Sequence, residues 1–161
     1  MNAPRFNPDQ RLVQRFLRDP GAPLAIDSNP LAADLGAVLR GADVQQRTLV
    51  LEFAPPARYL QGDGVIQGGI VATMLDFALA FVVLAALAPG DSAATVSLNL
   101  QFERAVLQGA VRVSAKLDRL GGRVAFASAT LASPDGKDTL ARASAVMAVS
   151  RTAAAAAPRP A

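Results

Sequence analysis

Apolar and polar residues alternate without exception over residues 95–103, "TVSLNLQFE". Successive side chains of a β-strand point to opposite faces, so this period of two predicts a strand with one apolar face. Residues 111–118 repeat the pattern, and residues 123–132 and 139–150 follow short turns, "LGG" and "SPDGKD", that suit hairpins. The second half of the chain therefore predicts four antiparallel strands. The apolar face of the first consists of Val96, Leu98, Leu100 and Phe102.

The first half begins with a helical pattern over residues 8–19, which lie between Pro8 and Pro20. Its apolar face can pack on the body of the domain, or it can meet a membrane surface or a partner. Residues 29–39 predict a short helical turn after a connector. Residues 36–43 and 45–55 predict two strands around a turn at Gly41–Asp43.

Between these two halves lies a long apolar segment, residues 66–88, with a single acid, Asp76. The ten Ile, Val, Leu and Phe residues of positions 70–88 contribute about −0.3 to −0.6 kcal/mol each to membrane insertion, against about +3 kcal/mol for the acid. This sum alone allows a membrane span. However, the four strands need an apolar partner for their inner faces, and the flanking "QGG" and "APGD" carry no basic or aromatic anchors. We therefore predict a buried core helix in an α+β domain, and no membrane association.

A carboxylate in a buried helix needs a hydrogen-bonding partner or a solvated site, because an unpaired buried charge is costly. Two interpretations of Asp76 stay open from the residues alone. It is either a catalytic group that faces a site, or a hydrogen-bonded group at a subunit interface.

The composition narrows the chemistry. The 161 residues include no His and no Cys, which excludes disulfides, thiol nucleophiles, Ser-His-Asp triads and the common zinc sites. The net charge is +3 and the basic residues are scattered among acids, so we expect no nucleic-acid partner. The first 20 residues carry charges throughout and lack the apolar core of a signal peptide, which predicts a cytoplasmic location.

These patterns predict one domain with two short flanking regions. Residues 1–28 form an N-terminal helix and connector, residues 29–151 the main domain, and residues 152–161 a low-complexity tail that we expect to be disordered.

Residues 59–76, "YLQGDGVIQGGIVATMLD", resemble a motif of hotdog-fold thioesterases of the phenylacetyl-CoA thioesterase (PaaI-like) type. Gln61 lies six residues before Gln67-Gly68-Gly69, and Asp76 lies nine residues after Gln67, as in that family. The resemblance extends over some 120 residues, including "NLQFERAV" and the hairpin "LDRLGGRVAFASATL".

The resemblance implies a hotdog fold, in which an antiparallel sheet wraps a long central helix. It also implies a homodimer joined edge to edge, often paired into a homotetramer. The active sites would lie between subunits, with Asp76 facing Gln61 and Gly68 of the other subunit. The substrate would be an acyl-CoA with a medium-chain or aromatic acyl group, and no metal or cofactor would be needed beyond the coenzyme A of the substrate.

The same resemblance implies the roles of individual residues. Asp76 would act as general base or nucleophile, and the N–H of Gly68 would polarise the thioester carbonyl. Gln61 would position the carbonyl or the water, and Thr95 would orient the water. Gln67 stands where the family usually has His, and an amide cannot change protonation near neutral pH.

Further residues are expected to bind substrate by their position. Ala80 lies one turn beyond Asp76, and arginines near the channel mouth suit the phosphates of coenzyme A. The expected substrate-binding set is Gly69, Ala80, Arg104, Arg119 and Arg123.

Gln67 also supports a second hypothesis, a non-catalytic protein of the same fold that binds acyl-CoA or another acyl ligand. A hydratase or dehydratase is not expected, because related enzymes use an Asp/His pair and this chain has no His.

Overall fold

The computed structural model describes residues 7–152. The long elements of the second half are α3 (Gly68–Ala85), β6 (Ser92–Phe102), β7 (Val111–Leu120), β8 (Val124–Ala132) and β9 (Thr139–Ser150). The first half contains α1 (Pro8–Phe16), β1 (Leu24–Ala25), α2 (Pro30–Asp34), β2 (Val38–Asp43) and β3 (Thr48–Phe53). A short hairpin before α3 is made of β4 (Leu60–Gln61) and β5 (Val65–Ile66), flanked by the 3₁₀ turns η1 (Ala57–Tyr59) and η2 (Gly62–Gly64).

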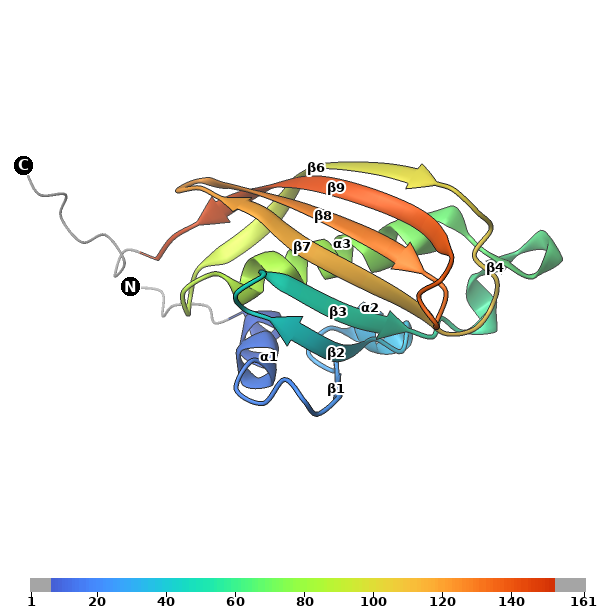
Figure 1. Ribbon diagram of the computed structural model, residues 1–161, viewed down its shortest axis with the longest axis horizontal. Helices are drawn as coiled ribbons and strands as arrows, with labels where there is room; N and C mark the ends of the chain where they lie inside the picture. The colour runs from blue at the N-terminus through green and yellow to red at the C-terminus, as the bar shows by residue number, and fades with distance from the viewer. Residues whose placement is uncertain (1–6, 153–161) are drawn as a thin grey trace, which may run out of the picture.

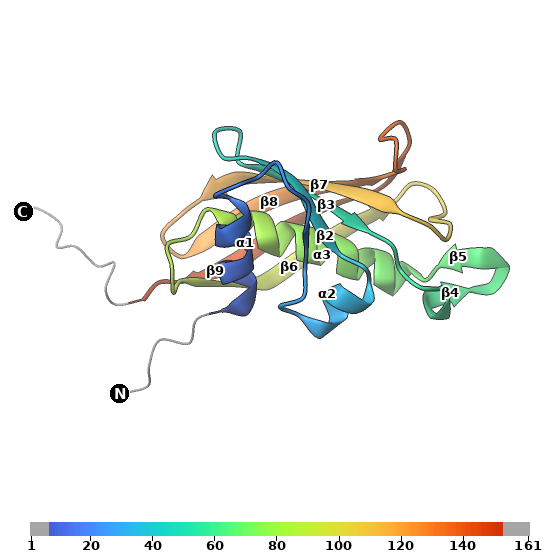
Figure 2. The ribbon, with the colours of Figure 1, turned by 90° about the horizontal axis from the view of Figure 1, so that it is seen from below.

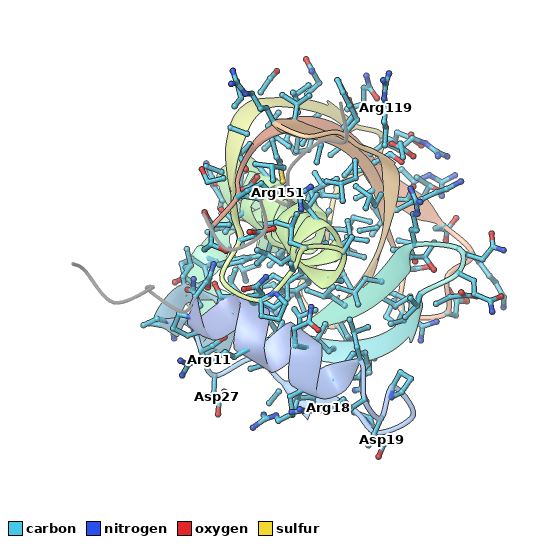
Figure 3. The ribbon with its side chains drawn as sticks, turned by 90° about the vertical axis from the view of Figure 1, so that its left-hand side faces the viewer. Arg11, Arg18, Asp19, Asp27, Arg119 and Arg151 are labelled. Carbon is cyan, nitrogen blue, oxygen red and sulfur yellow. The ribbon has the colours of Figure 1, made fainter. Side chains whose placement is uncertain are left out.

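One seven-stranded antiparallel sheet, in the order β1-β2-β3-β7-β8-β9-β6, curves over α3 (Figure 1). Seen along the helix, the sheet encloses α3 on one side and α1 crosses beneath it (Figure 3). The predicted α+β architecture, a hotdog fold with an additional N-terminal helix, is therefore confirmed.

The long apolar segment is the core helix of this fold. By length and composition alone α3 is the one helix among residues 7–152 that could cross a membrane, with a mean hydropathy of 2.1. Nine of its residues are buried, and it packs against β3, β6, β7, β8 and β9 as well as α1. The helix α3 and the inner faces of these strands bury one another, as the alternating pattern of the strands predicted.

Helix α1 closes the end of the core at the C-terminus of α3 (Figure 2). Its apolar face is buried in the core, and the side-chain amide of Gln10 donates to the Ala88 carbonyl at 2.8 Å. Because this face is occupied within the chain, it is not available to a membrane surface or a partner. Of the two interpretations of this helix, packing on the body of the domain is therefore the correct one.

The turn predicted at Gly41–Asp43 is wrong. These residues belong to β2, and the chain turns at residues 44–47 instead. The register of β2 against β3 shifts between Leu39 and Gly41, so the glycine marks a β-bulge. The connector before β2 also contains an unpredicted short strand, β1. The tail predicted for residues 152–161 lies, except for Thr152, outside the described residues.

The apolar face predicted for β6 is only partly buried, and only in its middle. β6 is an edge strand, and Val96 lies at a register shift against β9, where it is 67% exposed. Phe102 is 57% exposed because the end of the strand lies over the start of α3, where the helix residues are two glycines. Leu98 and Leu100 pack against the core as predicted.

Candidate active site

One stripe of α3 is left uncovered by the sheet. The residues at positions 69, 72, 73, 76, 77 and 80 follow helical i, i+3 and i+4 spacing, and each is half-buried or exposed. The stripe runs beside β6, whose outer edge has no strand partner among the described residues. Asp76 lies in the middle of this stripe, so the acid is not enclosed by its own chain.

Asp76 is hydrogen-bonded to a side chain of the neighbouring edge strand. The hydroxyl of Thr95 donates to Oδ1 of Asp76 at 2.8 Å. One carboxylate oxygen is thereby held in place, which leaves Oδ2 for another donor such as a water molecule. Two residues predicted for the site, one on the helix and one on β6, are thus brought together.

The first turn of α3 is fixed by contacts on both sides. The N–H of Gln67 donates to the Tyr59 carbonyl at 3.0 Å, and the N–H of Ile66 donates to the Val106 carbonyl at 2.7 Å. Tyr59 is itself held, since its hydroxyl donates to Asp34. These contacts hold the backbone in place where the chain enters the helix.

Gln67 is the N-cap of α3. Its Oε1 accepts a hydrogen bond at 3.2 Å from the N–H of Ile70, which also donates to the Gln67 backbone carbonyl at 2.9 Å. The N–H of Gly68 has no acceptor among residues 7–152. It is therefore available to an oxyanion or a carbonyl oxygen.

Gly69 lies against the capping side chain. A Cβ placed there would lie 2.7 Å from Oε1 of Gln67, so a larger residue would require the end of that side chain to move. This contact says nothing of a ligand, so the predicted binding role of Gly69 stays a prediction.

We expect Gly69→Ala to change the free energy of unfolding by less than about 1 kcal/mol, because the displacement of the capping side chain and the better helix propensity of alanine have opposite effects. Gln67→Ala should lower the free energy of unfolding by up to about 1 kcal/mol, because it removes the capping hydrogen bond alone. In the Gln67→Ala background, Gly69→Ala should stabilise by up to about 1 kcal/mol, since no capping side chain is left to displace. Urea unfolding of the four proteins measures this cycle, and an equal effect of Gly69→Ala in the two backgrounds would show that the substitution does not act through Gln67.

A cavity of about 360 Å³ opens next to Gly68. Gln61 from β4 and Arg104 after β6 also line it, so three predicted site residues meet at one opening. Its volume lies within the range of small-molecule sites. Arg104 is paired with Asp138 at 2.7 Å, and both side chains are largely exposed. The remaining walls are formed by Val65, Ile66, Val71, Phe102, Glu103, Ala105 and Val106.

The cavity and the Asp76–Thr95 pair are separate places on one chain. Gly68 and Asp76 are eight residues apart on the same helix, which corresponds to about 12 Å along its axis. A carbonyl oxygen bound at the Gly68 N–H is therefore out of reach of a water held by Asp76 of the same chain. The chemistry predicted from the motif needs these two halves to come from different copies.

The other predicted binding residues lie away from the cavity. Arg119 and Arg123 belong to the β7–β8 hairpin, at the end of the sheet near the C-terminus of α3, and Arg119 points outward there (Figure 3). Ala80 is half-buried on the uncovered stripe, one turn beyond Asp76.

Two features of the structure were not predicted from the sequence. Phe102 lines the cavity, whereas its place in the alternating strand predicted a core position. The acid that is truly buried is Asp91, which is 1% exposed and is bonded by Arg151 and by the backbone N–H of Thr152. Asp91 ties the chain after α3 to the end of β9, which is a structural task.

The chain is similar to known proteins over most of its length. A family model described as thioesterase superfamily matches residues 63–140. The chain is 33% identical over 120 residues to PA0474 of Pseudomonas aeruginosa, assigned as an esterase, which covers 74% of this chain and 87% of that protein. It is also 38% identical over 95 residues to the acyl-coenzyme A thioesterase THEM4 of Bos taurus, which covers 58% of this chain but only 37% of the bovine protein.

Among solved structures, a phenylacetic acid degradation-related protein from Ralstonia eutropha JMP134, assigned as a thioesterase, superposes with a TM-score of 0.73. The two chains are 30% identical, and the match covers 85% of this chain and 98% of that one. Similarity of this extent in both sequence and fold shows common membership. The chain belongs to the thioesterase superfamily.

Proposed function

We propose that this protein is an acyl-CoA thioesterase that hydrolyses a medium-chain or aromatic acyl-CoA to the free acid and coenzyme A. The observation that carries the proposal is the pair of half-sites on α3. One is a free Gly68 N–H at a cavity, and the other is a carboxylate held by Thr95 on an uncovered stripe.

In the proposed reaction, the thioester carbonyl oxygen accepts a hydrogen bond from the Gly68 N–H. This donor stabilises the negative charge that develops on the oxygen during attack. The glycine has no side chain, so the substrate can approach the backbone closely. Gln61 borders the same cavity and supplies an amide for the carbonyl or the water.

Asp76 acts on the carbonyl carbon from the opposite side. As general base it takes a proton from a water molecule, whose oxygen forms the new bond to carbon while the C–S bond breaks and the thiolate leaves. As nucleophile it forms a mixed anhydride that water then hydrolyses. In both routes the acid and the thiol are the products, and Thr95 keeps the carboxylate in one orientation.

We further propose that the functional unit is a homodimer, or a homotetramer of two such dimers. The free edge of β6 and the uncovered stripe of α3 lie on the same side of the chain. A second copy added at this edge can bring its Gly68 cavity to Asp76, which a single chain cannot do.

Gln67 takes a structural part in this proposal. As the N-cap of α3 it holds the turn that presents the Gly68 N–H, and this task needs no change of protonation. Arg104 lies at the mouth of the cavity and is proposed to contact the phosphates of coenzyme A. Its exposed pair with Asp138 is worth only about 0–1 kcal/mol, so exchanging that partner for a phosphate costs little.

The test is thiol release from short, medium, long and aromatic acyl-CoAs by the purified protein. We expect turnover, with the highest kcat/KM for a medium-chain or aromatic substrate. Binding of acyl-CoA without release of thiol from any member of the panel would refute the enzyme and support a binding protein of the same fold.

A further inference from the structure

The β4–β5 hairpin projects from the body of the domain and has little support at its tip. Its two strands contain two residues each, and residues 61–64 are all exposed. A Cβ placed on Gly62 or Gly64 would meet nothing within 4 Å. A two-stranded hairpin without further contacts is marginally stable in water. The tip therefore needs a neighbour if it is to hold Gln61 in one place at the cavity.

The shared site proposed above determines which part of a second copy lies near this tip. If Asp76 of each copy acts at Gly68 of the other, a twofold axis relates the two α3 helices, which run antiparallel and meet level with residue 72, midway between the two positions. Gly68 lies about 6 Å from that level, and the hairpin extends about 13 Å further at the usual rise of a strand. The tip thus lies about 19 Å from residue 72, in the direction of the C-terminus of the other copy's α3.

Helix α1 lies at that level. The last residue of α3, Ala85, is about 20 Å along the helix from residue 72, and α1 is attached there by the hydrogen bond from Gln10 to the Ala88 carbonyl. Figure 2 shows α3 along the length of the molecule, with the hairpin beyond its start and α1 across its end. The N-terminal end of α1, marked by Arg11, lies on the same side of the chain as β6, the edge at which the second copy is proposed to join (Figure 3).

The charges of the tip and of α1 are opposite. Asp63 is the acid of the tip and makes no ion pair within residues 7–152. On α1, Arg11, Arg15 and Arg18 follow one another at intervals of four and three residues, which places them on one face, opposite the face buried in the core. These arginines line a hollow of about 490 Å³, with one acid, Asp27, among its lining residues.

We infer that the tip of the β4–β5 hairpin docks on α1 of the second copy, with Asp63 facing Arg11 and Arg15. Helix α1 of one copy then supports the hairpin that carries Gln61 at the site of the other copy. This inference rests on the proposed function, because the shared site is what sets the twofold arrangement. It goes further in assigning the charged face of α1 a partner.

Cross-linking between introduced cysteines tests this contact directly, because the chain has no cysteine of its own. The probe is bismaleimidoethane, a short linker whose reach suits the distance between the backbones of an Asp–Arg pair. Asp63→Cys is combined with Arg11→Cys in one protein and with Arg15→Cys in another. Each of these side chains is exposed, so the substitutions should not unfold the protein. The hairpin and α1 lie at opposite ends of one chain, so a cross-link between them joins two copies (Figure 2).

Arg119 provides the matched control. It is an exposed arginine at the same end of the domain as α1, but it points outward from the sheet, on the side away from that helix (Figure 3). We expect covalent dimers on a denaturing gel from the pair at positions 63 and 11, from the pair at positions 63 and 15, or from both. Asp63→Cys with Arg119→Cys, and each single-cysteine variant, should stay monomeric on the gel. Equal cross-linking of the Arg119 control overturns the inference.

The same proteins separate this contact from the proposed function, since cross-linking needs no hydrolysis. Covalent dimers from a protein that releases no thiol from any acyl-CoA refute the enzyme and leave the docking of the hairpin in place. Thiol release without cross-linking of either pair, in a protein that sedimentation shows to be a dimer, overturns the docking and leaves the enzyme in place. A protein that sediments as a monomer overturns the docking as well.

Discussion

Asp76→Asn should lower kcat by about a hundredfold or more on the best acyl-CoA substrate, because general acid–base groups contribute roughly 10²- to 10⁴-fold. The substitution keeps the size of the side chain and an oxygen that can accept from the Thr95 hydroxyl, so the helix and its contact with β6 are preserved. What is removed is the basicity of the group, whether it deprotonates water or attacks the carbonyl itself. KM should change little, since the carboxylate acts on the reacting centre. Steady-state kinetics of thiol release measures both parameters.

Asp118→Asn is the matched control for this experiment. Asp118 is also a carboxylate that accepts a hydrogen bond from a hydroxyl, that of Ser128 at 3.1 Å, but it lies on the outer face of the sheet. Its amide variant should keep the wild-type kcat. If Asp76→Asn retains full activity while Asp118→Asn behaves as wild type, Asp76 is not the catalytic group, and its bond to Thr95 serves only to attach α3 to the edge strand.

The helices and strands that follow from periodicity were predicted correctly. The features that depend on where one element ends relative to another were not. The alternation over residues 111–118 and the apolar segment around Asp76 each require the other, because a sheet face and a core helix must bury one another. The exposure of Phe102 depends on where β6 ends relative to the start of α3, which no local pattern encodes. Gly41 suits a turn or a bulge equally well, so its place in β2 could not be decided from composition.

The candidate site was predictable as far as it lies on one element. The spacing of Gly68 and Asp76 follows from the sequence, and helix geometry then separates them by about 12 Å. The contact between Asp76 and Thr95 depends on how β6 lies against α3, and the register shift at Thr95 makes that alignment uncertain from spacing alone. Asp91 gave no signal at all, because its partner Arg151 is 60 residues away in the chain.

Gly68→Pro should lower kcat by about 10²- to 10³-fold, the usual cost of removing one donor from an oxyanion site. Proline has no N–H, yet it is favoured at the first position of a helix, where Gly68 lies. The preceding residue, Gln67, has φ −60° and ψ 136°, the extended conformation that a residue before proline prefers. The variant therefore removes the donor while the helix and its cap remain, and circular dichroism together with kinetics tests both statements.

Gly68→Ala distinguishes the donor from the space around it. Alanine keeps the N–H and places its methyl group in ordinary contact with Phe102, where it crowds the close approach of a substrate to the helix backbone. We expect KM to rise in this variant, with a much smaller loss of kcat than in Gly68→Pro. Equal losses of kcat in the two variants would mean that the glycine is needed for space alone and that its N–H plays no part in the reaction.

The Asp76→Asn and Gly68→Pro proteins, each nearly inactive, should regain activity when the two chains are co-expressed. If each site combines Asp76 of one subunit with Gly68 of the other, a mixed dimer has both substitutions in one site and neither in its second site. Random pairing makes half of the dimers mixed, so about a quarter of the wild-type activity should return. A site built within one chain cannot be restored by mixing, because every chain carries one of the two defects. Recovery therefore requires a shared site, and its absence in dimers shown to be mixed would contradict the proposed assembly.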